Sequence, residues 1–213
     1  MARRTKEEAE QTRNGILDAA EQMFFERGVA RTTLEEIARA AGVTRGAVYW
    51  HFDNKVDLFD AMQARARLPQ EDVIEWLLSR ETEQPLEHLA GALRDVLQVM
   101  ATDLRRRRVF TILFHRCEYV EEMRAFSQRK QDRTDQMLDR LVRFFELAAQ
   151  RGELSPHWPP KSAALGMHAM MVGLLSRMLD GDNPESLVAM AQECVTAFFA
   201  SLAGGAAATE RPA

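Results

Sequence analysis

Apolar residues recur every three or four positions along most of the chain, which is the spacing of one face of an α-helix. The pattern is clear over 16–24 and again over 86–100. No segment alternates polar and apolar residues for long enough to predict a strand. We therefore predict an all-α protein of about nine helices.

Turn and capping residues divide the first part of this pattern into helices. Gly28 follows the first helix at a position typical of a left-handed C-cap. Thr33 and Glu36 then have the spacing of a capping box at the start of a second helix. Thr44 and Asn54 are predicted to cap a third and a fourth helix.

Proline and glycine mark the later helices. Pro69 is expected to interrupt the fourth helix, and Pro85 to begin another. The remaining helices are predicted over 121–151, which ends before Gly152, over 161–179 and over 184–202. The tail over 205–213 lacks residues that form a core and is predicted to be disordered.

The run Leu34–Phe52, LEEIARAAGVTRGAVYWHF, predicts two short helices joined by a tight turn. Ala38, Gly42 and Val48 stand where a helix-turn-helix needs a small residue, a turn glycine and a buried aliphatic residue. The second helix of such a motif enters the major groove of DNA. The run therefore indicates a DNA-binding protein.

The residues of the second helix suggest specific contacts. Arg45 is the candidate for reading guanine, and Gly46 would allow a close approach to the DNA. Thr44 is expected to face a phosphate, and Tyr49 either a thymine methyl group or a phosphate. Beyond these, Trp50, His51 and Lys55 are candidates for holding the DNA backbone.

Two of these assignments leave an alternative open. Trp50 either contacts DNA or packs under the fourth helix, and His51 either binds a phosphate or caps the end of its helix. Val48 and Phe52 are expected to be core residues. Arg3 and Arg4 either reach an adjacent minor groove or form a solvated N-terminal tail.

Composition and charge are compatible with this interpretation. The net charge is −4, but residues 1–67 contain 11 Lys and Arg and 11 Asp and Glu, so the acidic excess lies beyond them. No apolar run approaches the roughly 20 residues of a membrane span, and the N-terminus has no apolar stretch of a secretory signal. Cys117 and Cys194 are too far apart in the sequence to suggest a metal or disulfide framework. We expect a cytoplasmic protein without a cofactor or a metal.

The block TRxxILDAAExxFxxxG…TTLEEIARAAGVTRGAVYWHFxNKxxLF resembles the TetR family of bacterial repressors. The N-terminal MARRTKEEAEQTR and the later ILFHRCEYVEEM, over 112–123, resemble its subgroup of AcrR-type regulators of multidrug efflux. This resemblance implies an all-helical homodimer that binds an inverted-repeat, pseudo-palindromic operator. It places the dimer interface on the last two long helices and a ligand cavity in the C-terminal part. By position, it also adds Thr33 to the DNA contacts.

The expected domains are a helix-turn-helix domain over 1–54 and a ligand-binding and dimerisation domain over 55–204. A ligand cavity between helices should be mostly apolar, and methionine suits a pocket that adapts to several ligands. For each candidate the alternative is a plain core position. The candidate lining residues are Leu93, Val96, Phe110, Phe114, Met137, Leu141, His168, Met171, Val172 and Leu175.

The leading hypothesis is a repressor that a hydrophobic small molecule releases from DNA, with multidrug efflux genes as its target. The alternative is a regulator of a metabolic or catabolic operon that responds to a fatty-acyl or aromatic intermediate. An enzyme is not expected, because no nucleophile–base pair, metal spacing or phosphate loop is apparent. Cys117 is predicted to be a buried thiol, with a redox role as the minor alternative.

Overall fold

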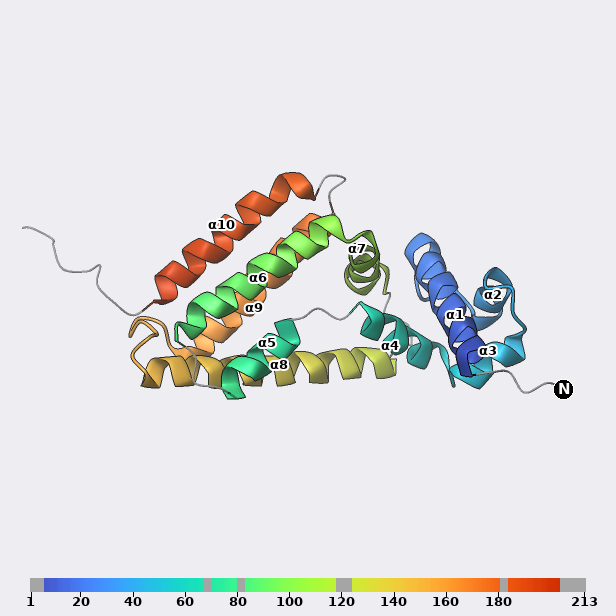
Figure 1. The fold of residues 1–213 in the computed structure, drawn as a ribbon, viewed down its shortest axis with the longest axis horizontal. Helices are drawn as coiled ribbons and strands as arrows, with labels where there is room; N and C mark the ends of the chain where they lie inside the picture. Colours follow the sequence, from blue (N-terminus) through green and yellow to red (C-terminus); the bar gives the residue numbers. More distant parts are fainter. Residues whose placement is uncertain (1–5, 67–69, 80–82, 118–123, 181–183, 204–213) are drawn as a thin grey trace, which may run out of the picture. The chain divides into compact units, whose positions relative to one another are not determined.

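The computed structural model describes residues 6–66, 70–79, 83–117, 124–180 and 184–203, and within these ranges it is helical (Figure 1). The only β feature there is an isolated bridge between Leu154 and Ala203. The helices are α1 (Lys6–Arg27), α2 (Leu34–Ala40), α3 (Arg45–His51), α4 (Lys55–Arg65), α5 (Gln70–Ser79), α6 (Pro85–Thr102), α7 (Leu104–Thr111), the π-helix η1 (Ile112–Arg116), α8 (Arg124–Gln150), α9 (Pro160–Leu179) and α10 (Glu185–Leu202). The predicted all-α class is confirmed.

The predicted caps are confirmed at the starts of three helices. The Thr33 and Glu36 side chains form the full capping box of α2. The side-chain oxygens of Thr44 and Asn54 accept hydrogen bonds from the backbone of α3 and α4. Gly28 ends α1 with a φ of 84°, a conformation that favours glycine. The interruption predicted at Pro69 and the tail lie outside the described residues.

The chain divides into two compact units. The first comprises residues 1–67 and 104–130, and the second comprises residues 68–103 and 131–213. The first unit therefore contains α7, η1 and the start of α8 in addition to the helix-turn-helix and α4. It reaches well beyond the domain boundary expected after residue 54.

One apolar cluster holds the first unit together. Ile16 and Phe24 of α1 are fully buried with Phe59 of α4, whose ring centroid lies 5.8 Å from that of Phe24. Val109 of α7 and Ile112 of η1 are buried in the same cluster. The segment over 104–116 is thus part of the core that supports the DNA-binding motif.

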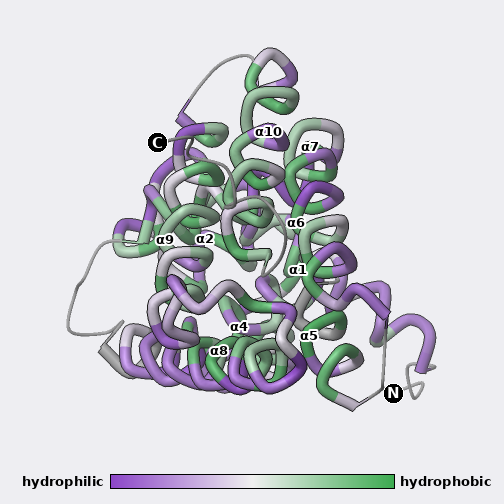
Figure 2. Tube along the Cα trace, turned by 90° about the vertical axis from the view of Figure 1, so that its left-hand side faces the viewer, coloured by the Kyte–Doolittle hydropathy of each residue, from purple (hydrophilic) through white to green (hydrophobic). Residues whose placement is uncertain are grey.

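In the second unit, α6 packs against α5, α9 and α10, and α9 also packs against α10. Figure 2 shows that α8 alternates between hydrophilic and hydrophobic residues, as expected of a helix with one polar face. Gly166 of α9 lies only 3.4 Å, at an ideal Cβ position, from the ring of Phe198 on α10. A Cβ at this position would already touch the Phe198 ring, so α9 and α10 pack closely here.

One helix among the described residues, α9, is long and apolar enough to cross a membrane by length and composition alone. Only 33% of its most apolar window is buried inside the chain. The helix is therefore more apolar than its contacts within the chain require.

Candidate nucleic-acid interface

The turn between α2 and α3 has the geometry that the sequence predicts. Gly42 has a φ of 68°, and the Val43 amide donates to the Ala38 carbonyl at 3.0 Å. Ala38 is 3% exposed and Val48 is fully buried. These contacts hold α3 against α2 by its apolar side, which leaves the opposite side of α3 at the surface.

The first turn of α3 has few large side chains on its exposed side. The Thr44 hydroxyl accepts a hydrogen bond from the Ala47 amide at 3.2 Å. Gly46 is exposed, and a Cβ at this position would meet only the Thr44 hydroxyl, at 3.9 Å. The backbone at this point is therefore open to solvent, as the close approach predicted for Gly46 requires.

Arg45 and Tyr49 form a pair on the exposed side of α3. The Arg45 guanidinium lies 5.3 Å from the Tyr49 ring centroid and donates a hydrogen bond to the Tyr49 hydroxyl at 3.4 Å. This hydrogen bond raises the pKa of Arg45 further, so the guanidinium stays charged. Both side chains are at the surface, where they can exchange this contact for one with a base or a phosphate.

The position of Trp50 excludes one of the two alternatives left by the sequence. Its side chain is 72% exposed, so it does not pack under α4. The Trp50 and His51 rings meet edge to face, with 4.5 Å between their centroids. Val48 and the 2% exposed Phe52 are core residues, as predicted.

Thr33 is placed at the surface by its capping role. The Thr33 amide donates to the Glu36 carboxylate at 2.9 Å, and the Glu36 amide donates to the Thr33 hydroxyl at 3.2 Å. The hydrogen bond from the Thr33 backbone, followed by the one from its hydroxyl, lowers the pKa of Glu36. The carboxylate therefore stays charged at the positive end of α2.

Lys55 departs from the expectation of an outward contact with DNA. It is only 4% exposed, and its ammonium group donates to the carbonyl of Thr32 at 3.1 Å. The first turn of α4 directs this side chain into the unit, where the backbone before α2 offers an acceptor. Arg3 and Arg4 lie outside the described residues.

One cation near α3 was not singled out by the sequence. Arg13 of α1 places its guanidinium 5.1 Å from the ring centroid of Phe52, the residue that ends α3. Only the packing of α1 against α3 brings the two residues together, and they are 39 positions apart in the sequence. Arg13 is half-buried there and adds a positive charge beside α3.

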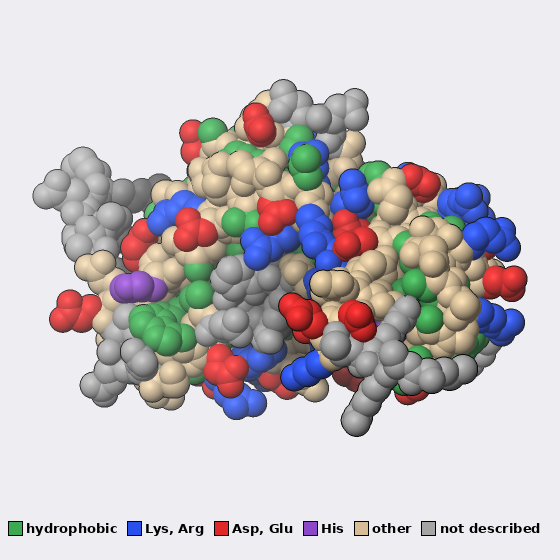
Figure 3. Space-filling model, turned by 45° about the vertical axis from the view of Figure 1, so that its right-hand side comes forward, with side chains coloured by type: hydrophobic (Ala, Val, Ile, Leu, Met, Phe, Trp, Pro, Cys, Tyr) green, Lys and Arg blue, Asp and Glu red, His purple; other side chains and the backbone are tan. Residues whose placement is uncertain are grey.

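Two arginines of the basic block over 105–108 in α7 form ion pairs with α1. Arg105 and Arg108 donate to the carboxylate of Glu21 at 3.1 and 3.4 Å, and Arg105 also pairs with Asp18 at 2.6 Å. Arg65 of α4 reaches the same Asp18 at 2.9 Å. Figure 3 shows acidic and basic side chains interspersed over one face of the molecule. The network joins α1, α4 and α7 within the first unit.

The candidate ligand-lining residues are divided between the units. Phe110 and Phe114 belong to the first unit and stack with 6.3 Å between ring centroids. The other eight belong to the second unit, where Leu93, Val96, Leu141, Met171 and Leu175 are buried and Met137 and His168 are half-buried. Burial lowers the pKa of His168, which keeps its imidazole neutral. Val172 differs from the rest because it is 39% exposed on the outer side of α9.

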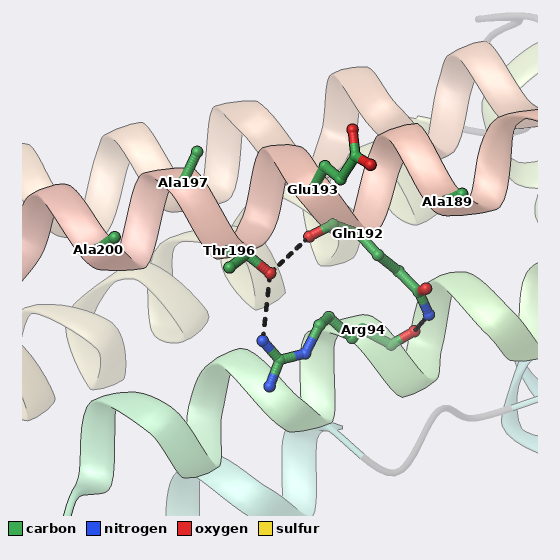
Figure 4. A pocket seen from close by; sticks show the side chains of 7 residues that line it. All are labelled: Arg94, Ala189, Gln192, Glu193, Thr196, Ala197 and Ala200. Atoms are coloured by element: carbon green, nitrogen blue, oxygen red, sulfur yellow. Dashed lines mark hydrogen bonds between the residues drawn. The ribbon is translucent and has the colours of Figure 1, made fainter.

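An open groove of about 540 Å³ lies between α6 and α10 and contains none of these candidates (Figure 4). Three alanines of α10 leave room in it. Arg94 of α6 donates to the Thr196 hydroxyl at 3.2 Å, and the Gln192 amide donates to the Arg94 carbonyl at 3.2 Å. The groove is lined by Arg94, Ala189, Gln192, Glu193, Thr196, Ala197 and Ala200.

Cys117 packs against the core of the first unit but is only half-buried, so it is less covered than the predicted buried thiol. It follows the end of η1 directly, where the helix no longer covers it. Among the residues that the structure describes, no group of three or more histidine, cysteine, aspartate or glutamate side chains is arranged to hold a metal.

Comparison with known proteins gives matches along most of the chain. Residues 16–62 match the family described as "Bacterial regulatory proteins, tetR family", and residues 84–203 match "MAATS-type transcriptional repressor, C-terminal region". The "HTH-type transcriptional repressor BepR" of Brucella suis biovar 1 is 40% identical over 200 residues, which cover 94% of this chain and 96% of the relative.

Solved structures give the same result. NalD, described as "the secondary repressor of MexAB-OprM multidrug efflux pump in Pseudomonas aeruginosa", is 38% identical with a TM-score of 0.80, over 93% of this chain and 98% of that one. A "SmeT-Triclosan complex" is 32% identical with a TM-score of 0.77, over 95% of this chain and all of the other.

Proposed function

This chain belongs to the TetR family of bacterial regulatory proteins and is a DNA-binding transcriptional regulator rather than an enzyme; from that premise we propose that it represses multidrug efflux genes as a homodimer on an inverted-repeat operator. A hydrophobic small molecule would release it from the DNA. NalD, which is similar over nearly the whole chain, is named as a repressor of an efflux pump. The similarity extends through the C-terminal half, where sensing is expected.

The observation that carries the DNA-binding part is the exposed side of α3. The first turn of α3 has no side chain at Gly46. Arg45 and Tyr49 lie at the surface, and Trp50 beside them is 72% exposed. A charged guanidinium suits a guanine edge, and the aromatic side chains suit the sugar–phosphate backbone.

The homodimer is supported by the outer sides of α9 and α10. We give the name outer face to five exposed, uncharged residues, three on α9 and two on α10, namely Leu165, Ala169, Val172, Met190 and Cys194. All five residues are exposed, with Leu165 at 59% and Met190 at 61%, and none carries a charge. Large uncharged patches on soluble chains usually mark an interface.

A two-fold dimer would pair this outer face with itself, so that each copy covers the other's apolar residues. The groove of Figure 4 is on the same helix α10, and its alanines would allow a neighbouring helix to approach closely. Val172, an expected ligand contact, is better placed for this subunit contact because it is exposed next to Leu165 and Ala169.

Ligand control is supported by the SmeT complex, since a similar chain is known with triclosan bound. In this chain the second unit buries apolar candidates together with a half-buried, neutral His168. Apolar walls with one polar group suit a hydrophobic molecule that carries a hydrogen-bonding group. Binding would shift α4 and change the spacing of the two recognition helices, which lowers the affinity for DNA.

The test is footprinting on the DNA upstream of the gene, with and without triclosan. We expect protection of an inverted repeat that disappears when triclosan is added. Binding of triclosan is measured separately by calorimetry, and further hydrophobic antibiotics extend the panel. The proposal is wrong if no site is protected at low salt, or if every ligand that binds leaves the affinity for DNA unchanged.

A further inference from the structure

Helix α3 is short, and each of its ends needs support from the rest of the first unit. It has seven residues, Arg45–His51, of which only Val48 is buried. Helices of so few residues are not stable in water without packing from other parts of the fold. The side-chain cap of Thr44 and the packing against α2 support the first end. The last turn, which contains Trp50 and His51, depends on other contacts.

Phe52 holds the last turn of α3. Its amide donates to the Val48 carbonyl at 2.9 Å, and its own backbone is extended, so the helix ends there. The Phe52 ring is 2% exposed and belongs to the core of the first unit. The His51 ring lies 6.2 Å from it, and the Trp50 ring lies 4.5 Å from that of His51, between centroids. A shift of Phe52 would therefore move the aromatic side chains that precede it.

Arg13 of α1 contacts the ring of Phe52. The distance of 5.1 Å from the guanidinium carbon to the ring centroid is within the roughly 6 Å of a cation–π contact. Arg13 is half-buried, and partial removal of the guanidinium from water strengthens such a contact. The guanidinium thus joins α1 to the end of α3.

The part of α1 that carries Arg13 is itself firmly held. Ile16, one turn further on, is fully buried. Arg65 of α4 donates to the Asn14 carbonyl at 3.5 Å and pairs with the Asp18 carboxylate at 2.9 Å. The Arg13 guanidinium therefore starts from a fixed position on the core, against which the Phe52 ring can be held.

We propose that Arg13 is a positioning residue, which holds the last turn of α3 for DNA binding through the contact of its guanidinium with the Phe52 ring. The proposal rests on the DNA-binding role of α3 proposed above. Without the guanidinium, the last turn leaves the position that DNA requires for part of the time. Apparent affinity falls in proportion to the fraction of the protein that is competent to bind. The contact itself therefore sets the largest loss, about 30-fold for a half-buried cation–π pair.

The first test measures amide hydrogen exchange in the full chain without DNA, so its result does not depend on whether α3 binds an operator. Arg13→Met removes the charge and keeps a long apolar side chain. We expect exchange over residues 48–54 to become about 3- to 30-fold faster, because the last turn of α3 loses its contact with α1. Unchanged exchange over this segment overturns the proposal.

Arg108→Met is the matched control for this test. The Arg108 guanidinium lies 5.7 Å from the ring centroid of Phe25, so the variant also loses a cation–π contact of a half-buried arginine in the first unit. Phe25 belongs to α1 and lies outside the helix-turn-helix. Exchange over residues 48–54 should therefore stay unchanged. Acceleration equal to that in Arg13→Met would show a general loss of stability and would contradict the proposal.

The second test is a double-mutant cycle on the affinity for the operator. Arg13→Met should weaken specific binding about 3- to 30-fold in the otherwise unsubstituted chain. Phe52→Leu keeps an apolar core residue but removes the aromatic face. In that background the same change at Arg13 should cost less than about twofold, because the contact is already lost. Equal losses in both backgrounds mean that Arg13 acts independently of the ring, which overturns the proposal.

The salt dependence of binding covers the case in which Phe52→Leu does not fold. A lost phosphate contact makes the slope of log K against log salt shallower by about 0.9 and weakens all DNA sequences alike. For Arg13→Met we expect an unchanged slope and a loss confined to the operator. A shallower slope with equal losses on all sequences would make Arg13 a phosphate contact and overturn the proposal, as would undiminished operator binding.

Discussion

Leu165 gives the sharpest test of the dimer, because its contribution can be worked out from its exposure. The side chain is 59% exposed in the isolated chain and belongs to the uncharged outer face. Full burial of a leucine side chain contributes about 1.5–3 kcal/mol, so covering the exposed part contributes roughly 1–2 kcal/mol for each subunit. In a two-fold interface each subunit contributes one Leu165, so this free energy enters twice.

Because alanine keeps one methyl group, Leu165→Ala should weaken the dimer by somewhat less than twice this amount, roughly 2–3 kcal/mol, which corresponds to an increase of about 30- to 150-fold in the dimer dissociation constant. Sedimentation velocity over a dilution series measures this constant directly. The thermal stability of the monomer should change little, because the lost side chain lies mostly in solvent.

Leu104→Ala is the matched control. Leu104 begins α7 and is 65% exposed, so it is similar in chemistry and exposure but lies off the outer face. We expect its dimer constant to equal that of the unsubstituted chain. If Leu165→Ala and Leu104→Ala both stay within about twofold of it, the outer face is not the interface and the reasoning from exposure is refuted.

Three further predictions concern DNA reading, stability and pH. Arg45→Ala should cost about 1–3 kcal/mol at one base pair and relax specificity there, as measured by anisotropy on operators changed at single positions, whereas an equal loss on every sequence would make Arg45 a phosphate contact. Glu21→Gln should lower the free energy of unfolding in urea by about 1–2 kcal/mol, because the nearly buried Glu21 carboxylate pairs with two half-exposed arginines. The same change at the exposed Glu87, which pairs with Arg94, should have a much smaller effect, and equal effects would contradict the reading of the network. Burial lowers the pKa of His168, so the unfolded chain binds a proton more readily than the folded one, and stability should fall as pH drops below the ordinary histidine value. The melting temperature should therefore drop more between about pH 7.5 and 5.5 in the unsubstituted chain than in His168→Gln, and equal drops would show that His168 is not the cause.

Much of the first unit was predictable because its signals are local. The helix caps, the turn glycines and the buried Val48 and Phe52 depend on spacings of a few residues, and the structure confirms them. The exposed candidates Arg45 and Tyr49 also follow from helical spacing, since a helix buried by one side must present the other.

Lys55 and Arg13 could not be placed in this way. The acceptor for Lys55 is a carbonyl 23 residues earlier, and the partner of Arg13 is a ring 39 residues later. A basic residue beside a DNA-binding motif is most simply read as a phosphate contact. Only the packing of α1, α2 and α4 shows which ammonium or guanidinium is directed inward.

The sequence by itself determined the helical class, the position and type of the DNA-binding motif, and the family. Helix periodicity, caps and the motif all depend on residues that are close together in the chain. The tertiary structure decided which helices share a core. It placed α7 and η1 with the DNA-binding helices, through Val109 and Ile112 and through the ion pairs of Arg105. It also left the apolar outer face of α9 and α10 uncovered. These outcomes depend on contacts between residues far apart in the chain. The hydrophobic effect favours burial of apolar residues but is not directional, so the local sequence does not specify which residues pack together.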